Sequence, residues 1–214
     1  DASIPAGTVT RALSIFVGQP AASNTGFLPP TAHQPVTSSA GDNNGFQSNP
    51  TNAYIVDGAV AVDTNSGTTT STSCTSSGKD KHIFRDFGIN LPAGVSVNGI
   101  EVQLTARADS TSRSPRMCVD LSWNGGTNWT AVKTTPTLQR SLSLFPLGSA
   151  ADTWGRTWSD ANFTNASFRV RISNIASSTA RDFSLDGIAV RVSYGDGTVP
   201  TVTAFSIPAT SASL

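Results

Sequence analysis

The chain has 214 residues, no formal net charge at pH 7, and charged side chains at only 13% of positions. This balance excludes the basic surface that nucleic-acid binding or docking on an anionic membrane requires. No run of 18 apolar residues is present, so we expect no membrane insertion.

Strong helix formers are scarce, because the sequence has one Glu, Glu101, and three Lys. Ser, Thr, Gly and Pro are abundant, which favours strands and turns. The length suits one large β-domain with a substantial core, or one domain with extensions.

The N-terminal part is irregular apart from one predicted strand at residues 8–17. Residues 18–52 carry many turn signals and are expected to form an extended arm. Residues 53–63 predict one or two short strands around Asp57-Gly58, and a polar loop with Cys74 follows at 64–78.

The rest of the chain predicts strands at short, regular spacing. Alternation is clearest in 98–108, where Ile100, Val102, Leu104 and Ala106 share one face. The phase slips by one residue at Asp186-Gly187, which predicts a β-bulge. The predicted strands span residues 82–89, 98–108, 116–123, 138–145 (with Leu142 and Leu144 inward), 167–173 and 182–194.

These strands predict an all-β, jelly-roll-like β-sandwich with extended N- and C-terminal segments. We expect residues 1–48 to form an N-terminal strand and arm, 49–195 the sandwich, and 196–214 a linker and a terminal strand.

Cys74 and Cys118 are the chain's two cysteines. In a Ser/Thr-rich, Lys-poor chain they favour one disulfide and an oxidising compartment, with two free thiols as the alternative. Cys118 alternates onto the outer face of its strand, so the bridge is expected to join the surface loop and not to cross the core.

Residues Ser122–Trp129 resemble an Asp-box, with Asn124 in place of the Asp, Gly126 in register and Trp129 closing the motif. Asn and Gly suit the positive φ angles of a hairpin turn. A single copy implies a structural role and neither a propeller nor catalysis.

The stretch from Asn49 to Tyr194 resembles an uncharacterised β-sandwich repeat module of secreted bacterial surface proteins. Residues 201–214 resemble the first strand of a bacterial immunoglobulin-like module. These resemblances imply a secreted, multidomain surface protein and assign no ligand or catalytic residue. The motifs that carry the first resemblance are Asn49–Tyr54 with Asp57-Gly58, Phe87–Gly94, Asn98–Val102, Ser122–Trp129, Asp152–Trp158, Asn162–Val170 and Leu185–Tyr194.

Trp154 and Trp158, with Arg156 between them, are the candidate ligand-binding residues. Exposed indoles in a loop would stack on a sugar ring; the alternative is that they cap the end of the sandwich and are buried.

Calcium is the one candidate cofactor. Asp57, Asp63 and Asn65 offer oxygen ligands, as does the run Asp42-Asn43-Asn44. The alternative is that these residues only form turns.

Catalysis is not expected. His33 and His82 lack metal-ligand spacing, there is no nucleophile elbow, and no carboxylate pair is singled out. Arg107, Arg169, Arg171 and Arg191 are expected on one outer face, as a solvated surface or as a strip for acidic polysaccharide.

The sequence therefore favours a non-catalytic extracellular structural protein, a subunit of a surface fibre whose copies exchange strands. Its partner would be further copies of itself. The alternative is a carbohydrate-binding or adhesive module whose partner is a polysaccharide. The exchanged strand would be residues 8–17 or the tail Thr201, Val202, Thr203, Ala204, Phe205, Ser206 and Ile207.

Overall fold

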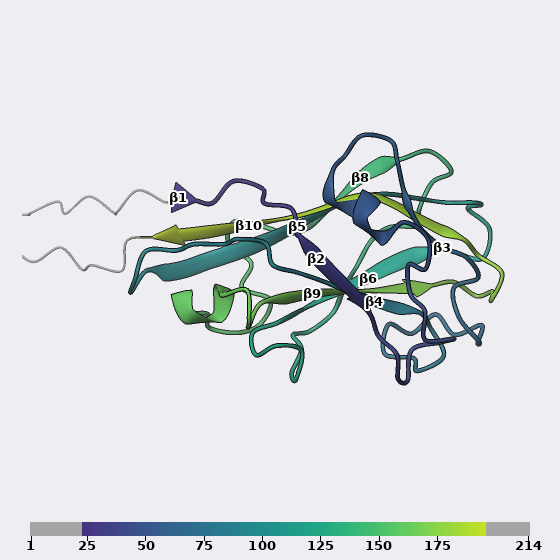
Figure 1. Ribbon diagram of the computed structural model, residues 1–214, viewed down its shortest axis with the longest axis horizontal. Helices are drawn as coiled ribbons and strands as arrows, with labels where there is room; N and C mark the ends of the chain where they lie inside the picture. Colours follow the sequence, from purple (N-terminus) through teal and green to yellow (C-terminus); the bar gives the residue numbers. More distant parts are fainter. Residues whose placement is uncertain (1–22, 196–214) are drawn as a thin grey trace, which may run out of the picture.

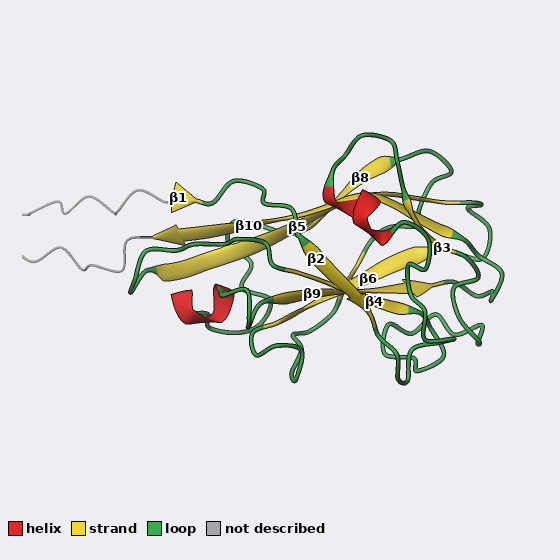
Figure 2. Cartoon of the chain, in the orientation of Figure 1, coloured by secondary structure: helices red, strands yellow, loops and turns green. Residues whose placement is uncertain are grey.

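The computed structural model describes residues 23–195. Two antiparallel β-sheets stack face to face (Figure 1), and apolar side chains fill the space between them, so the predicted all-β sandwich is confirmed. The only helices in this range are two short 3₁₀ turns, η1 (Pro50–Tyr54) and η2 (Asp160–Phe163), drawn in red in Figure 2. The segments 8–17 and 201–207, the two expected donor strands, lie outside the described residues.

The first sheet has the order β1-β10-β5-β8, with β3 also paired to β10. Its two central strands, β5 and β10, are the longest of the described chain and pair over nearly their whole length. The strands are β1 (Ser23–Asn24), β3 (Ala61–Asp63), β5 (Ser96–Ala108), β8 (Ser143–Gly148) and β10 (Phe183–Gly195).

The second sheet has the order β2-β4-β9-β6-β7. From β4 to β6, and again from β8 to β10, successive strands alternate between the two sheets, which is jelly-roll-like connectivity. Neither helix of the described chain is long and apolar enough to span a bilayer. The strands are β2 (Ala32–Pro35), β4 (Lys81–Arg85), β6 (Arg116–Ser122), β7 (Lys133–Thr134) and β9 (Arg169–Ile175).

Period-two patterning builds the core. On β5, Ile100, Val102, Leu104 and Ala106 are fully buried, as the alternation predicts, whereas Gln103 between them is partly exposed. The core side chains come from the inner faces of both sheets.

The predicted bulge in β10 is present, because the register with β5 shifts between Leu185 and Gly187. The carboxylate of Asp186 accepts hydrogen bonds from the N–H groups of Asp57 (3.2 Å) and Gly58 (2.8 Å). A Cβ on Gly187 would lie 2.3 Å from Val56 Cγ2, so a larger residue at position 187 would displace the Val56 side chain. The bulge therefore fixes the 56–58 turn against the outer face of the sheet.

The strand predicted at 138–145 has the wrong bounds and the wrong phase. Residues 138–142 are irregular, and in β8 it is Phe145 and Leu147 that point inward while Leu144 is exposed. β8 is an edge strand that pairs with β5 alone. This position suits Pro146, because proline has no N–H to donate to a second neighbouring strand.

The N-terminal arm contributes more regular structure than the sequence predicts. β1 pairs with β10 and β2 pairs with β4, so both sheets receive a strand from residues that precede Asn49. Of the strands expected in 53–63 only β3 forms, because Pro50 at the first helical position starts the η1 turn instead.

The predicted disulfide is confirmed. Cys74 and Cys118 are bonded, with their Cα atoms 5.7 Å apart. Cys118 stands on β6 outside the core cluster, and the bridge fastens the 64–80 loop to the outer face of the second sheet.

Reduction of this bridge should destabilise the fold substantially. A crosslink that closes a loop of this length restricts the unfolded chain, with an effect of about 4 kcal/mol on the chain-entropy model. We expect the urea unfolding midpoint to fall on reduction, as followed by tryptophan fluorescence. The Cys74→Ser/Cys118→Ser variant, which cannot reoxidise, is the control. Equal midpoints for the reduced and oxidised protein would contradict this expectation.

Candidate functional site

The loop with Trp154 and Trp158 closes one end of the core. The two side chains are only 2% and 4% exposed. Trp154 Nε1–H donates to the Ile100 carbonyl at 2.9 Å, and Trp158 Nε1–H donates to the Thr153 carbonyl at 2.8 Å. Trp158 also packs against Phe163 and Phe168.

This burial contradicts the expectation that both indoles stack on a sugar. The Arg156 guanidinium also packs within the protein, 3.8 Å from the ring centroid of Trp123 and 4.5 Å from that of Trp158. The alternative, an aromatic plug at the end of the sandwich, describes the arrangement.

The Ser122–Trp129 segment forms a tight turn. Ser122 Oγ accepts from the Gly126 N–H at 2.8 Å, and Asn124 Oδ1 accepts from the Asn128 N–H at 2.9 Å. The Trp129 ring is covered by the guanidinium of Arg171, 4.0 Å from its centroid. The turn is thus held internally and shows no ligand-binding arrangement.

The four arginines do not share one face. Arg171 lies in the second sheet and makes a bidentate pair with Asp120 at 3.1 and 2.6 Å. Arg107 and Arg191 lie in the first sheet, where Arg191 pairs with Glu101 at 2.6 Å. The prediction of one shared outer face is wrong because β9 belongs to the second sheet, whereas β5 and β10 belong to the first.

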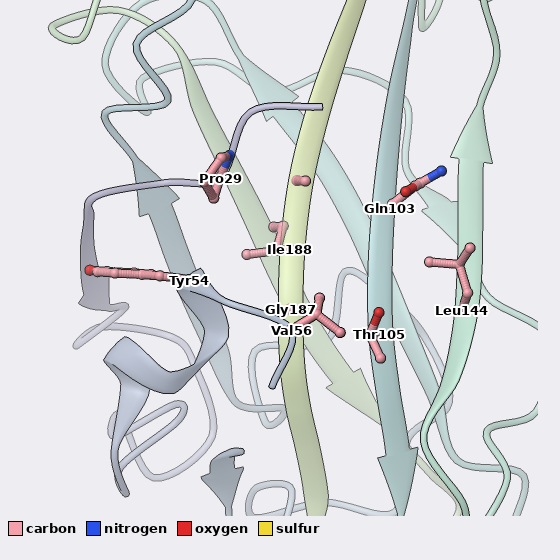
Figure 3. A pocket seen from close by; sticks show the side chains of 9 residues that line it. Pro29, Tyr54, Val56, Gln103, Thr105, Leu144, Gly187 and Ile188 are labelled. Atoms are coloured by element: carbon pink, nitrogen blue, oxygen red, sulfur yellow. The ribbon is translucent and has the colours of Figure 1, made fainter. Parts of the chain in front are cut away.

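A groove of about 320 Å³ opens on the outer face of the first sheet (Figure 3). Its floor consists of cross-strand pairs of β5 and β10, with Thr105 opposite Gly187 and Gln103 opposite Ala189. The small residues on β10 leave the space open. The lining residues are Pro29, Tyr54, Val56, Gln103, Thr105, Leu144, Gly187, Ile188 and Ala189.

Apolar side chains form the walls of the groove. Tyr54 lies beside Pro29 on one side of β10, and Leu144 of β8 lies on the other side, beyond β5 (Figure 3). Val56 is 65% exposed and Leu144 57% exposed, which is unusual for aliphatic residues that gather in one place. Sequence analysis missed this groove because its walls come from three separate segments.

Charge is confined to the margin of the groove. The next cross-strand pair along the floor is Glu101–Arg191, in which the two charges neutralise each other at 2.6 Å. Phe27 covers the Arg191 guanidinium, 4.4 Å from the ring centroid. The groove itself contains no ionisable side chain apart from Tyr54.

The three calcium candidates do not share partners. Asp57 is exposed and accepts from the Ala59 N–H, and the N–H of exposed Asn65 donates to Asp182. Asp63 is buried and its Oδ2 accepts from the Asn174 side-chain amide at 2.7 Å. The Asp42 N–H donates to the carboxylate of Asp80 at 3.0 Å, a residue that the sequence did not single out.

The two histidines lie side by side, His33 on β2 and His82 on β4. His82 Nδ1 accepts from the Phe46 N–H at 3.1 Å, so the proton of neutral His82 sits on Nε2, which donates to His33 Nδ1 at 3.0 Å. Burial and then the charge of His33 lower the pKa of His82 to about 3. Burial and then Arg85 lower the pKa of His33.

No family model matches the sequence, and no curated protein does. Solved structures with a similar arrangement include a truncated AlyQ with CBM32 and alginate lyase domains, at 17% identity over 81% of this chain with a TM-score of 0.37. TmCBM61 in complex with β-1,4-galactotriose gives 11% identity over 79% of this chain and 86% of its own, with a TM-score of 0.35. CBM29_1, a family 29 carbohydrate-binding module from Piromyces equi, gives 8% identity over 81% and 91%, with a TM-score of 0.32.

The chain spans about a third, 34%, of the AlyQ structure. Because these TM-scores are below 0.5 and the identities below 25%, the similarities assign neither a family nor a ligand to this chain.

The histidine pair makes a testable prediction about pH. In a ¹⁵N NMR titration, His82 should keep its neutral Nε2–H form down to about pH 4, because its pKa is about 3. In the unfolded chain it would take up a proton near the ordinary pKa of about 6.5. Between about pH 6.5 and 3 only the unfolded chain takes up a proton on this histidine. The free energy of unfolding is therefore highest above pH 6.5 and decreases as the pH falls toward 3.

In the His33→Gln variant the only remaining histidine signals come from His82, so this variant assigns the signals in the spectrum of the unmodified chain. Midpoints near 6.5 for both histidines of the unmodified chain would contradict the assigned tautomer and its burial.

Proposed function

We propose that this chain is a non-catalytic carbohydrate-binding module of an extracellular protein, and that the groove on β10, β5 and β8 binds a neutral sugar chain. The observation that carries the proposal is an open, uncharged groove whose walls are apolar and whose floor carries an amide and a hydroxyl. Binding grooves are typically of this kind, mostly apolar with a few polar groups that fix orientation.

The apolar walls suit the C–H faces of sugar rings. Tyr54, Val56 and Leu144 present aromatic and aliphatic surface that remains in contact with water in the free protein. Covering this surface with a ring face would remove it from water, with a gain of about 25 cal/mol per Å² before the costs of association.

The polar floor suits hydroxyl groups. The Gln103 amide donates to Glu101 Oε1 at 3.4 Å and keeps its second N–H and its carbonyl oxygen for a ligand, and Thr105 offers one hydroxyl. Because the adjacent Glu101–Arg191 charges are already paired, the face favours a neutral glycan over an acidic one.

The Cys74–Cys118 bridge supports the proposed extracellular location, because disulfides are typical of oxidising environments. The fibre hypothesis rests on residues 8–17 and 201–207, outside the described part of the chain. The groove thus gives the binding hypothesis a specific observation that the fibre hypothesis lacks.

A glycan array followed by affinity electrophoresis with soluble polysaccharides tests the proposal. We expect binding to at least one neutral polysaccharide, weakened about tenfold by Gln103→Ala, since one hydrogen bond contributes about 1.4 kcal/mol or less. Ala189→Trp should abolish binding, because it fills the floor of the groove without removing a core contact.

The matched control is Val132→Ser, which replaces an exposed aliphatic residue outside the groove. It should bind as the unmodified chain does. Binding that survives Ala189→Trp, or an array with no neutral glycan bound, would refute the proposed site.

A further inference from the structure

Two carboxylates are buried side by side where the two sheets meet. Asp63 ends β3 in the first sheet, and Asp80 immediately precedes β4 in the second. Both are 0% exposed, and Asn174 of β9, which contacts both residues, is 2% exposed.

The contacts within this group leave several oxygens without partners. Asn174 Nδ2–H donates to Asp63 Oδ2 at 2.7 Å, and the Asp42 N–H donates to Asp80 Oδ1 at 3.0 Å. The second carboxylate oxygens, Asp63 Oδ1 and Asp80 Oδ2, are buried with no hydrogen-bond partner, and so is Asn174 Oδ1. Buried polar atoms are nearly always paired, so three unpaired oxygens on residues that contact one another require an explanation.

No protein cation in the described residues neutralises this pair at contact distance. None of the ion pairs includes Asp63 or Asp80. Lys79 is near, but its Nζ–H groups donate to the Ser178 carbonyl at 2.9 Å and to Ser66 Oγ at 3.4 Å. Burial, together with the negative charge of the neighbouring carboxylate, raises the pKa of Asp63 well above its ordinary value.

The loop before η1 closes over the carboxylates. A Cβ on Gly41 would lie 1.9 Å from Asp80 Oδ1, so this loop can approach only with glycine at position 41. Asp42 follows on the same loop and adds a further carboxylate near Asp80. Asn44 Oδ1, two residues on, is also buried without a partner.

We propose that Asp63, Asp80 and Asn174 bind one calcium ion that joins the two sheets. Carboxylate, amide and main-chain oxygens are the ligands that calcium takes, six to eight at a time and in flexible geometry. Magnesium prefers strict octahedral geometry and keeps several waters, which fits a fully buried group less well. In residues 23–195 no group of three or more His, Cys, Asp and Glu side chains could hold a metal ion, so this site would need amide and main-chain oxygens besides its two carboxylates. It offers no thiolate or imidazole, the ligands that suit transition metals.

The orientation of the Asn174 side-chain amide decides whether its oxygen can bind the ion. Its nitrogen and oxygen differ only by a half-turn of the amide, and its nitrogen faces Asp63. A half-turn would bring Oδ1, which has no hydrogen-bond partner, toward the carboxylates. There it would bind the cation as a further oxygen ligand. The ion would then draw ligands from β3, from the start of β4 and from β9.

Thermal unfolding of the whole chain, stripped with EDTA and titrated with CaCl₂, tests the site. At a calcium concentration about 100 times the dissociation constant, we expect the midpoint to rise by at least about 5 °C. Isothermal titration calorimetry should give one site per chain. Asp63→Asn and Asp80→Asn should abolish the rise.

The variants remain informative even though they lie in the core. Without metal, Asp80→Asn should unfold at or above the midpoint of the unmodified chain, because it removes one of two buried like charges. Loss of the calcium response in a folded variant therefore reports on the site. Asp57→Asn is the matched control, since Asp57 is exposed and bonded to its own turn, and it should keep the full response.

Three results would overturn the proposal. One is a midpoint that millimolar calcium leaves unchanged, which would mean that a shared proton or Lys79 neutralises the pair. Another is a calcium response that persists in Asp80→Asn. The last is an equal response to MgCl₂ at the same concentration.

Discussion

The antiparallel pairing of β5 with β10 organises the molecule. Every other strand of the first sheet attaches to one of these two, β8 to β5 and both β1 and β3 to β10. The inner face of the pair supplies the centre of the core, and the outer face supplies the floor of the groove. A slip of one residue would exchange these faces. The bulge at Asp186-Gly187 lies within this pairing, and the Asp186 carboxylate turns it into an anchor for the 57–58 turn.

The sequence predicted the parts of the fold in which local pattern and burial agree. Apolar residues recur at every second position over most of β5, β6 and β9, and on either side of the phase slip in β10, so their inward faces and the bulge in β10 could be predicted directly. β8 was misplaced because Leu144 is an apolar residue on the outside, where it belongs to the groove. β1 and β2 were missed because they are short, polar and paired only through contacts distant in the sequence.

The candidate sites depend on such distant contacts even more strongly. Asp63 was singled out, but its partner Asn174 lies 111 positions away, and no spacing rule connects them. The tryptophans show a related limit: their residue type allowed either a sugar platform or a buried cap, and the structure uses both indoles to close the core. Composition identifies residues capable of binding. Only the fold decides which of them remain accessible.

One segment of chain, residues 54–63, connects the groove to the buried carboxylates. Tyr54 and Val56 line the groove at its start, and Asp63 stands at its end. Between them the segment is held by Asp186 and by β3, which is only three residues long. A buried, uncompensated charge at Asp63 opposes this placement. A cation bound to Asp63 would fix the C-terminal end of this segment, and the N-terminal end of the same segment lines the proposed sugar groove. The shape of the groove and the joining of the two sheets would then depend on the same buried carboxylate.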